Sequence, residues 1–368
     1  MSRADRANTK PLSAAERRRW THVGVLAALA MLLGYAETFV PIPLPGVKLG
    51  LANIAILATL ALKDLPGAVC IAAIKVLASG FLFGSPLTMA YAVAGTTLSM
   101  LGMAPLSRLR TMRLWMVSVV GSLLHETGQL MVASAILGTD AVWYLSPVLF
   151  AAGCVTGVMC GLLAQQLVDV FPSQDDTPAL DRQDDAIQAR PLDMRAHTAF
   201  VALAVFAVVV LHLSNVTALL ACTCASLASC LATRVPLRSM ARATGPLAGI
   251  ALGTLALHLL VLPQDATLAT AVAVARLSSI TFAGMAFMRL IPQDALSATI
   301  AWLVSPLTRM GIRTQGFVLA FDVALRLLPV VSEVAQERLQ SQEGPKGVRG
   351  LRATLLGLVQ EVLARVGA

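Results

Sequence analysis

The sequence predicts an all-α, polytopic membrane protein with roughly ten spanning segments. Of its 368 residues, 57% are apolar and only 13% are charged, and the mean hydropathy is +0.76. A soluble domain of this size needs far more charge to solvate its surface. The apolar residues also fall in blocks of about 20, the length of helix that crosses the hydrocarbon core of a bilayer. The lipid bilayer is therefore the expected solvent.

The basic residues favour a membrane protein over a nucleic-acid-binding one, although the net charge is +8. They cluster between apolar blocks, at Arg17 to Arg19, Arg108 to Arg113 and Arg234 to Arg242. These clusters fall at alternate ends of consecutive spans, as the positive-inside rule requires. The few aromatic residues do not interleave with them, so no base-stacking surface is indicated and no nucleic-acid partner is expected.

The cysteines all lie inside apolar blocks, with no His or Asp at metal-ligand spacing. They are Cys70, Cys154, Cys160, Cys222, Cys224 and Cys230. This placement favours packing between helices over disulfides or a metal site. We expect no metal and no cofactor.

Residues 1–171 are predicted to form a six-span bundle with short connections. The spans are expected at His22–Val40, Leu49–Leu62, Leu65–Phe83, Pro86–Met103, Leu114–Leu137 and Pro147–Phe171. The first is expected to remain uncleaved, because Glu37, Thr38 and Phe39 stand where a signal peptide has small residues. The loops at Lys63-Asp64 and Arg108 to Arg113 are expected inside the cell.

Residues 172–194 form an acidic, non-apolar stretch that is predicted to be a cytoplasmic linker between domains. A second membrane domain, 195–290, has four expected spans, at Thr198–Leu213, Val216–Leu231, Leu247–Leu262 and Leu268–Met288. Residues 291–368 have shorter, charge-interrupted apolar runs and an amphipathic stretch at Val348–Val366. They are expected to form helices at and below the cytoplasmic surface of the plasma (inner) membrane, with both termini cytoplasmic.

Two predicted spans carry glycine at every fourth position, a pattern that lets helix backbones approach closely. The positions are Gly153, Gly157, Gly161, Gly245, Gly249 and Gly253. Each stripe can pack within its own bundle, or the two can form a seam between the halves of the chain.

Polar residues inside the first bundle are candidate ligand contacts, because such residues usually face a cavity or a partner in a membrane protein. The candidates are Lys48, Asn53, Lys75, His125 and Gln129. Their ammonium, amide and imidazole groups suit an anionic or polar heteroaromatic small molecule. Alternatively, Lys48 reaches lipid headgroups, and His125 with Glu126 forms an interhelical pair. For Arg276 in the second half, a bond between helices or to a helix backbone is expected.

Near the C-terminus, residues 324–333 predict a proline-kinked amphipathic helix that runs into the cytosol. Arg326 and Glu333 lie two helical turns apart on one face, with Pro329 between them. This string resembles the coupling region of the transmembrane T component of energy-coupling factor (ECF) transporters. The resemblance covers about 195–366 and implies that Arg326, Pro329, Glu333, Arg338 and Gln342 couple to separate ATPase subunits. The usual Ala-Arg-Gly after Gln342 is broken here, so Arg338 or Arg349 would have to substitute.

The first half resembles the small membrane family known as component I of heptaprenyl diphosphate synthase (the Gx transporter family). That family is itself similar to the substrate-binding S components of ECF transporters. The matching strings run from Pro45 to Ile54 and from His125 to Gln129. Together the two resemblances imply a fused S–T permease subunit that binds a small molecule in its first bundle. No P-loop string occurs, so ATP-binding-cassette ATPases are expected as partners.

Two other functions stay open at this stage. The first is a membrane subunit of polyprenyl (heptaprenyl) diphosphate synthesis, which needs closely spaced aspartates to hold Mg²⁺ on a diphosphate. Asp175-Asp176 and Asp184-Asp185 are the only such pairs, and both lie in the predicted linker, so we expect no enzyme. The second is a scaffold with a degenerate coupling module, in which the face of Arg326 and Glu333 is simply solvated.

Overall fold

The structure is a computed structural model that describes residues 12–37, 49–82, 86–109, 111–137, 140–170, 194–241, 266–290, 293–310 and 313–340, with residue 357. Within these residues all the secondary structure is helical, comprising eleven α-helices and one 3-10 helix. The all-α part of the predicted fold class is therefore confirmed. Lys48, Gly245, Gly249, Gly253, Gln342 and the stretches 247–262 and 348–366 lie outside the described residues, apart from residue 357.

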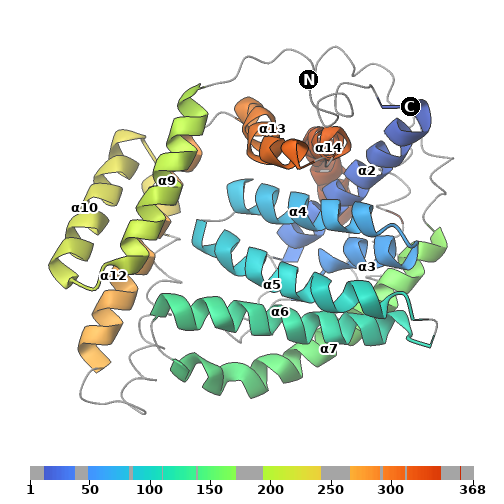
Figure 1. Ribbon diagram of the computed structural model, residues 1–368, viewed down its shortest axis with the longest axis horizontal. Helices are drawn as coiled ribbons and strands as arrows, with labels where there is room; N and C mark the ends of the chain where they lie inside the picture. Colours follow the sequence, from blue (N-terminus) through green and yellow to red (C-terminus); the bar gives the residue numbers. More distant parts are fainter. Residues whose placement is uncertain are drawn as a thin grey trace.

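The first half forms a helical bundle whose long members run side by side (Figure 1). Its elements are α2 (Ala14–Glu37), α3 (Asn53–Ala61), α4 (Leu65–Leu82), α5 (Pro86–Leu106), α6 (Leu114–Leu137), the 3-10 helix η1 (Asp140–Leu145) and α7 (Ser146–Val170). Helix α3 differs from the span expected at Leu49–Leu62. Its 9 residues are too few to cross a bilayer, and 7 of them are buried. It is a core helix of the bundle.

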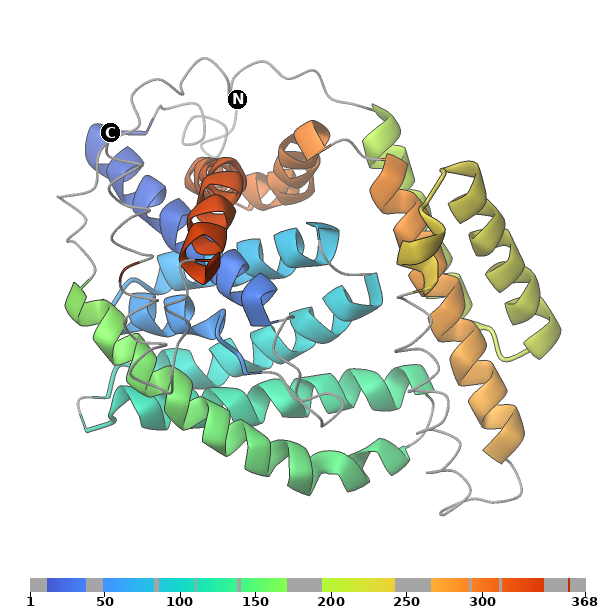
Figure 2. The same ribbon diagram turned by 180° about the vertical axis from the view of Figure 1, so that it is seen from behind.

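The second half contributes α9 (Met194–His212), α10 (Val216–Ala232) and α12 (Ala266–Leu290). Helices α9 and α10 both pack on α12, which contacts α5 and α6, and the three lie across the ends of those helices instead of alongside the first bundle (Figures 1 and 2). The two sets of helices run in different directions, so they cannot both be parallel to a single membrane normal. The predicted ten-span topology therefore remains a prediction.

The last two described helices are α13 (Gln293–Arg309) and α14 (Gln315–Gln340). The first half of α14 packs along α2, where Phe321 is 1% exposed. A Cβ at Gly24 of α2 would lie 2.8 Å from the carbonyl oxygen of Ala320, so the two backbones pass very close together. At the end of this contact Arg313 forms an ion pair of 2.9 Å with Glu16. The C-terminal part of the chain thus shares a core with its first helix.

Apolar side chains cover much of the outer surface of α7, α9 and α10. Those exposed include Val148, Val155, Leu162, Val201, Val205, Val208, Leu220, Leu227 and Leu231. In the described part of the chain, two helices are long and apolar enough to cross a membrane, at Met89–Leu106 and Val142–Val168. An apolar surface of this extent suits contact with lipid. These features favour association with a membrane.

Candidate functional site

The turn before α3 is held by a carboxylate from α2. The N–H of Gly50 donates to Oε1 of Glu37 over 2.8 Å. Gly50 has a φ of +75°, in the left-handed region where a side chain is strained. The Gly-Leu-Ala turn at 50–52 then leads into α3, and Cys160 of α7 donates its S–H to the carbonyl of Leu49 over 3.1 Å. Helices α2 and α7 together fix the position at which α3 starts.

Asn53 and Lys75, two of the predicted ligand contacts, meet at this point. Nζ of Lys75, in the middle of α4, donates to Oδ1 of Asn53 over 2.7 Å. Asn53 is the first residue of α3, and both side chains are partly buried. The contact uses one of the three donors of the ammonium. An ammonium and an amide, 22 residues apart in sequence, thus form one polar group inside the bundle.

His125 and Gln129 form a second polar pair, one turn apart on α6. Nε2 of the Gln129 amide lies 2.9 Å from Nε2 of the imidazole. Which of the two groups donates depends on the tautomer of the imidazole. The imidazole packs against α5, because a Cβ at Gly95 would lie 2.9 Å from Cε1 and Nδ1 of the ring.

Gly95 was not among the residues singled out from the sequence. A glycine in the middle of an apolar span, facing a span that carries a polar pair, is the signal that could have pointed to it. The structure therefore brings the described candidates together as Asn53 with Lys75 and His125 with Gln129. Their role in binding a ligand stays a prediction.

The residues predicted to couple to ATPases lie on the second half of α14. Nε of Arg326 forms an ion pair of 2.7 Å with Oδ2 of Asp322, one turn earlier, and the Arg326 side chain is 39% exposed. Pro329 lies inside the helix, and both Pro329 and Glu333 are exposed. Arg338 belongs to α14, but its side chain lies outside the described part of the structure.

The first glycine stripe packs within the first bundle, against α6. A Cβ at Gly157 would lie 2.8 Å from the Cα of Val119, and one at Gly161 would overlap the Cα of Trp115. At Gly153 the nearest atom would be 3.7 Å away, an ordinary contact. Close approach of α6 and α7 therefore depends on Gly157 and Gly161.

Arg276 of α12 binds the ends of two other helices. Its guanidinium donates to the carbonyl of Leu213, just after α9, over 2.8 and 3.1 Å. A third donor reaches the carbonyl of Ile136 near the end of α6, over 3.4 Å. The expected helix-backbone bond is confirmed, and it links the second half of the chain to the first.

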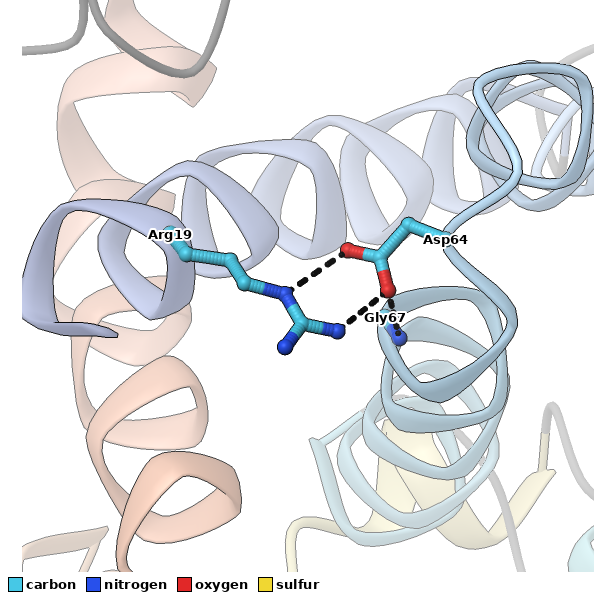
Figure 3. A network of polar contacts seen from close by, with 3 residues as sticks. All are labelled: Arg19, Asp64 and Gly67. Atoms are coloured by element: carbon cyan, nitrogen blue, oxygen red, sulfur yellow. Dashed lines mark hydrogen bonds and ion pairs between the residues drawn. The ribbon is translucent and has the colours of Figure 1, made fainter. Parts of the chain in front are cut away.

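The predicted inside loops of the first bundle meet at one end. Figure 3 shows the guanidinium of Arg19, on α2, donating hydrogen bonds to both carboxylate oxygens of Asp64. Asp64 also accepts the N–H of Gly67 over 2.9 Å at the start of α4. The hydrogen bond to Asp64 raises the pKa of Arg19 above its usual value. Lys63 donates to the carbonyl of Ser107 over 2.7 Å, which joins the second loop to the first.

Comparison with known proteins gives one family match. A family model described as heptaprenyl diphosphate synthase component I matches residues 26–167. This range runs from within α2 to near the end of α7 and includes Lys48, Asn53, Lys75, His125 and Gln129. It supports the resemblance of the first half to S-like membrane proteins. No curated protein and no solved structure shows a significant match to the chain.

Proposed function

We propose that this chain is a membrane permease subunit of an ECF-type ABC transporter, and that it binds a small molecule in its first bundle. The family match over 26–167 carries the proposal, because it spans the bundle that holds both polar pairs. Ionisable and amide side chains inside an apolar bundle characteristically mark a ligand or ion pathway. The exposed apolar faces of α7, α9 and α10 add support for a lipid environment.

The ligand is proposed to be anionic or to carry a polar heteroaromatic ring. The ammonium of Lys75 is a donor suited to carboxylate or phosphate oxygens, and such charge-assisted bonds are roughly twice as strong as neutral ones. The Asn53 amide and the His125 ring supply donor and acceptor atoms that can orient it. Lys48 would join them from the segment that precedes Gly50.

The second half is proposed to act as a T-like coupling domain for separate ATPase subunits. The support is the Arg326, Pro329 and Glu333 string, whose members are exposed on α14. The packing of α14 on α2 offers a mechanical route, because a force applied to α14 would reach the first bundle directly.

The binding proposal is tested by mass spectrometry of small molecules retained by the chain purified from its native membrane, followed by Lys75→Met. This variant keeps approximate volume and removes the charge. For an anionic ligand the binding free energy should weaken by about 1.5–3 kcal/mol. Lys75→Arg is the matched control, because it keeps the charge and should keep most of the affinity. Unchanged binding in both Lys75→Met and His125→Ala would remove this site from consideration.

The coupling proposal is tested by co-purification of an ATPase with the full chain. Arg326→Ala, or truncation before Ser332, should abolish capture. Asp322→Asn is the control, because it breaks the same ion pair on α14 but keeps the Arg326 cation. If Arg326→Ala loses the ATPase and Asp322→Asn keeps it, Arg326 contacts the ATPase directly. If both variants lose the ATPase equally, the ion pair has a structural role in α14. Failure to crosslink any ATPase from this segment would leave the second half as a scaffold.

A second candidate function follows from the description of the matching family. A subunit of heptaprenyl diphosphate synthesis would be needed for elongation of a prenyl diphosphate. Membranes with and without the chain, supplied with an allylic prenyl diphosphate, isopentenyl diphosphate and Mg²⁺, would distinguish the two functions. Product formation that depends on the chain would favour the synthase, and the permease proposal expects none.

A further inference from the structure

A cleft opens at the basic end of the first bundle, apart from the two polar pairs. Its volume is about 480 Å³, and the α3–α4 turn, the α5–α6 loop and α7 enclose it. Two cations, Lys63 and Arg113, line it together with the polar groups of Ser107 and Gln165 and the indole of Trp115. No carboxylate is among the lining residues. The size suits a small polar group.

The backbone and its contacts hold Lys63 at the cleft. Lys63 has a φ of +63°, and the N–H of the next residue closes the end of α3 onto the carbonyl of Thr59. This is the Schellman arrangement that ends many helices. The bond from Nζ to the Ser107 carbonyl then aims the ammonium at the neighbouring loop. Asp64, the adjacent acid, is already engaged by Arg19 and therefore does not neutralise this end of the cleft.

Arg113 stands immediately before α6 and is exposed. Its carbonyl accepts the first helical hydrogen bonds, from Met116 and Val117, so the guanidinium extends from the very start of the helix. It forms no ion pair with any residue that the structure describes. The positive end of the α6 dipole adds to the field of the two cations. Among the described residues, no acidic side chain lines the cleft or pairs with Arg113 to offset this positive charge.

The rim of the cleft is apolar. Leu109, Met112 and Leu162, which line the cleft, are 49%, 42% and 51% exposed. Cations beside exposed aliphatic side chains and a tryptophan are typical of the boundary between headgroups and acyl chains. A free inorganic ion would satisfy the cations but would leave this rim in water.

We propose that this cleft binds the phosphate of an anionic phospholipid in the cytoplasmic leaflet. Lys63 and Arg113 hold the phosphate by charge-assisted hydrogen bonds, and the acyl chains cover the apolar rim. The inference rests on the proposed membrane placement of the first bundle, and it does not depend on a transported ligand or on an ATPase.

The test is lipid retention by the purified full chain in dodecyl maltoside, measured by native mass spectrometry. Phosphatidylglycerol and the zwitterionic phosphatidylcholine are titrated in parallel. Lys63→Gln and Arg113→Gln should each weaken phosphatidylglycerol binding about tenfold, because each removes one charge-assisted bond. Phosphatidylcholine should bind more weakly to the unaltered chain and respond little to either change.

Arg234→Gln is a closely matched control. Arg234 is an exposed cation with a φ of +55° that follows α10, as Lys63 follows α3. The N–H after it closes onto the carbonyl of Cys230 in the same way. Because Arg234 is not part of the cleft, phosphatidylglycerol binding should be unchanged in this variant.

Equal retention of phosphatidylglycerol in the Lys63→Gln, Arg113→Gln double variant and the unaltered chain would overturn the proposal. Displacement of the lipid by inorganic phosphate at a similar concentration would also overturn it, in favour of a free anion. A melting temperature that phosphatidylglycerol raises in the unaltered chain, but not in the variants, would support it independently. Release of the chain from membranes by alkaline carbonate would instead contradict the membrane placement itself.

Discussion

Asp64 shows how much one carboxylate contributes at the residue scale. Its side chain is 7% exposed, and it binds the Arg19 guanidinium through both oxygens while accepting the N–H of Gly67. The last bond caps the first turn of α4, where backbone N–H groups have no partner within the helix. One side chain therefore ties α2 to α4 and also starts α4.

The two roles of Asp64 can be separated by substitution. Asp64→Asn keeps a capping oxygen but loses the charge, so the free energy of unfolding should fall by about 1–2 kcal/mol. Asp64→Ala also removes the cap and should lower it by roughly 1 kcal/mol more. Reversible unfolding in mixed micelles measures both.

Asp140→Asn is the control for this pair. Asp140 accepts a hydrogen bond from Ser134 at an exposed site, and its replacement should change stability by less than about 0.5 kcal/mol. If Asp64→Asn proved equally neutral, the ion pair with Arg19 would contribute nothing measurable.

At the scale of the helices, the apolar blocks predicted most boundaries well. Helix α6 spans the predicted Leu114–Leu137, and α4, α5, α7, α10 and α12 agree to within about three residues. These blocks are bounded by charged or turn-forming residues, which makes their ends visible in the sequence.

Helix α2 begins earlier than predicted, and the sequence contains a capping signal for this earlier start. Ser13 and Glu16 form a reciprocal capping box, with Ser13 N–H donating to Glu16 and Glu16 N–H donating to the Ser13 hydroxyl.

The shortness of α3 and the contacts of the polar residues could not be predicted from the sequence. The block Leu49–Leu62 is almost entirely apolar, and the left-handed Gly50 with its bond to Glu37 goes with the later start of the helix at Asn53. Lys75 and Asn53 were identified as candidates because charge and amide groups are unfavourable in lipid. Their direct contact depends on how α3 and α4 pack, which periodicity does not determine.

The α6–α7 contact predicts a graded response along one glycine stripe. Gly161→Ala should be strongly destabilising, by about 2–4 kcal/mol, because its Cβ would overlap the backbone of Trp115 and the helices would have to separate. Gly153→Ala should be neutral or stabilising by up to about 1 kcal/mol, because the nearest atom is at an ordinary distance and alanine favours the helix. Thermal unfolding in detergent measures both changes. Similar destabilisation at the two positions would contradict this packing.

At the scale of the whole molecule, Arg276 joins parts of the chain that are 140 residues apart. Its guanidinium donates to carbonyls at the ends of α9 and α6. The last carbonyls of a helix receive no hydrogen bond from an N–H of the same helix. Arg276→Met keeps the length and removes all three bonds, so stability should fall by about 2–4 kcal/mol.

The specific expectation for Arg276→Met is weaker association of the two halves. A protease site inserted near Asp181, in the predicted linker, allows the chain to be cut after purification. The halves should stay together in both proteins without denaturant, because α14 packs on α2, and should separate at a lower urea concentration in Arg276→Met, as size-exclusion chromatography would show. Arg234→Met should have no effect, because its side chain is exposed and no such bond joins it to another residue that the structure describes. Separation at the same urea concentration in both would show that the contact of α14 with α2 holds the halves without help from Arg276.

The final prediction concerns membrane topology, for which the sequence pattern and the arrangement of helices in the structure lead to different expectations. The basic loops meet at one end of the first bundle, as positive-inside topology expects, whereas α9, α10 and α12 lie across its other end (Figure 1). With the six native cysteines replaced, single cysteines at Asp140 and Gln264 should react with an impermeant maleimide on intact cells. Those at Asp181 and Gln340 should react only after permeabilisation. External labelling at Asp181 would overturn the predicted orientation. Labelling at Asp140 without labelling at Gln264 would mean that the second half does not cross the bilayer as predicted, since position 264 would then lie on the wrong side.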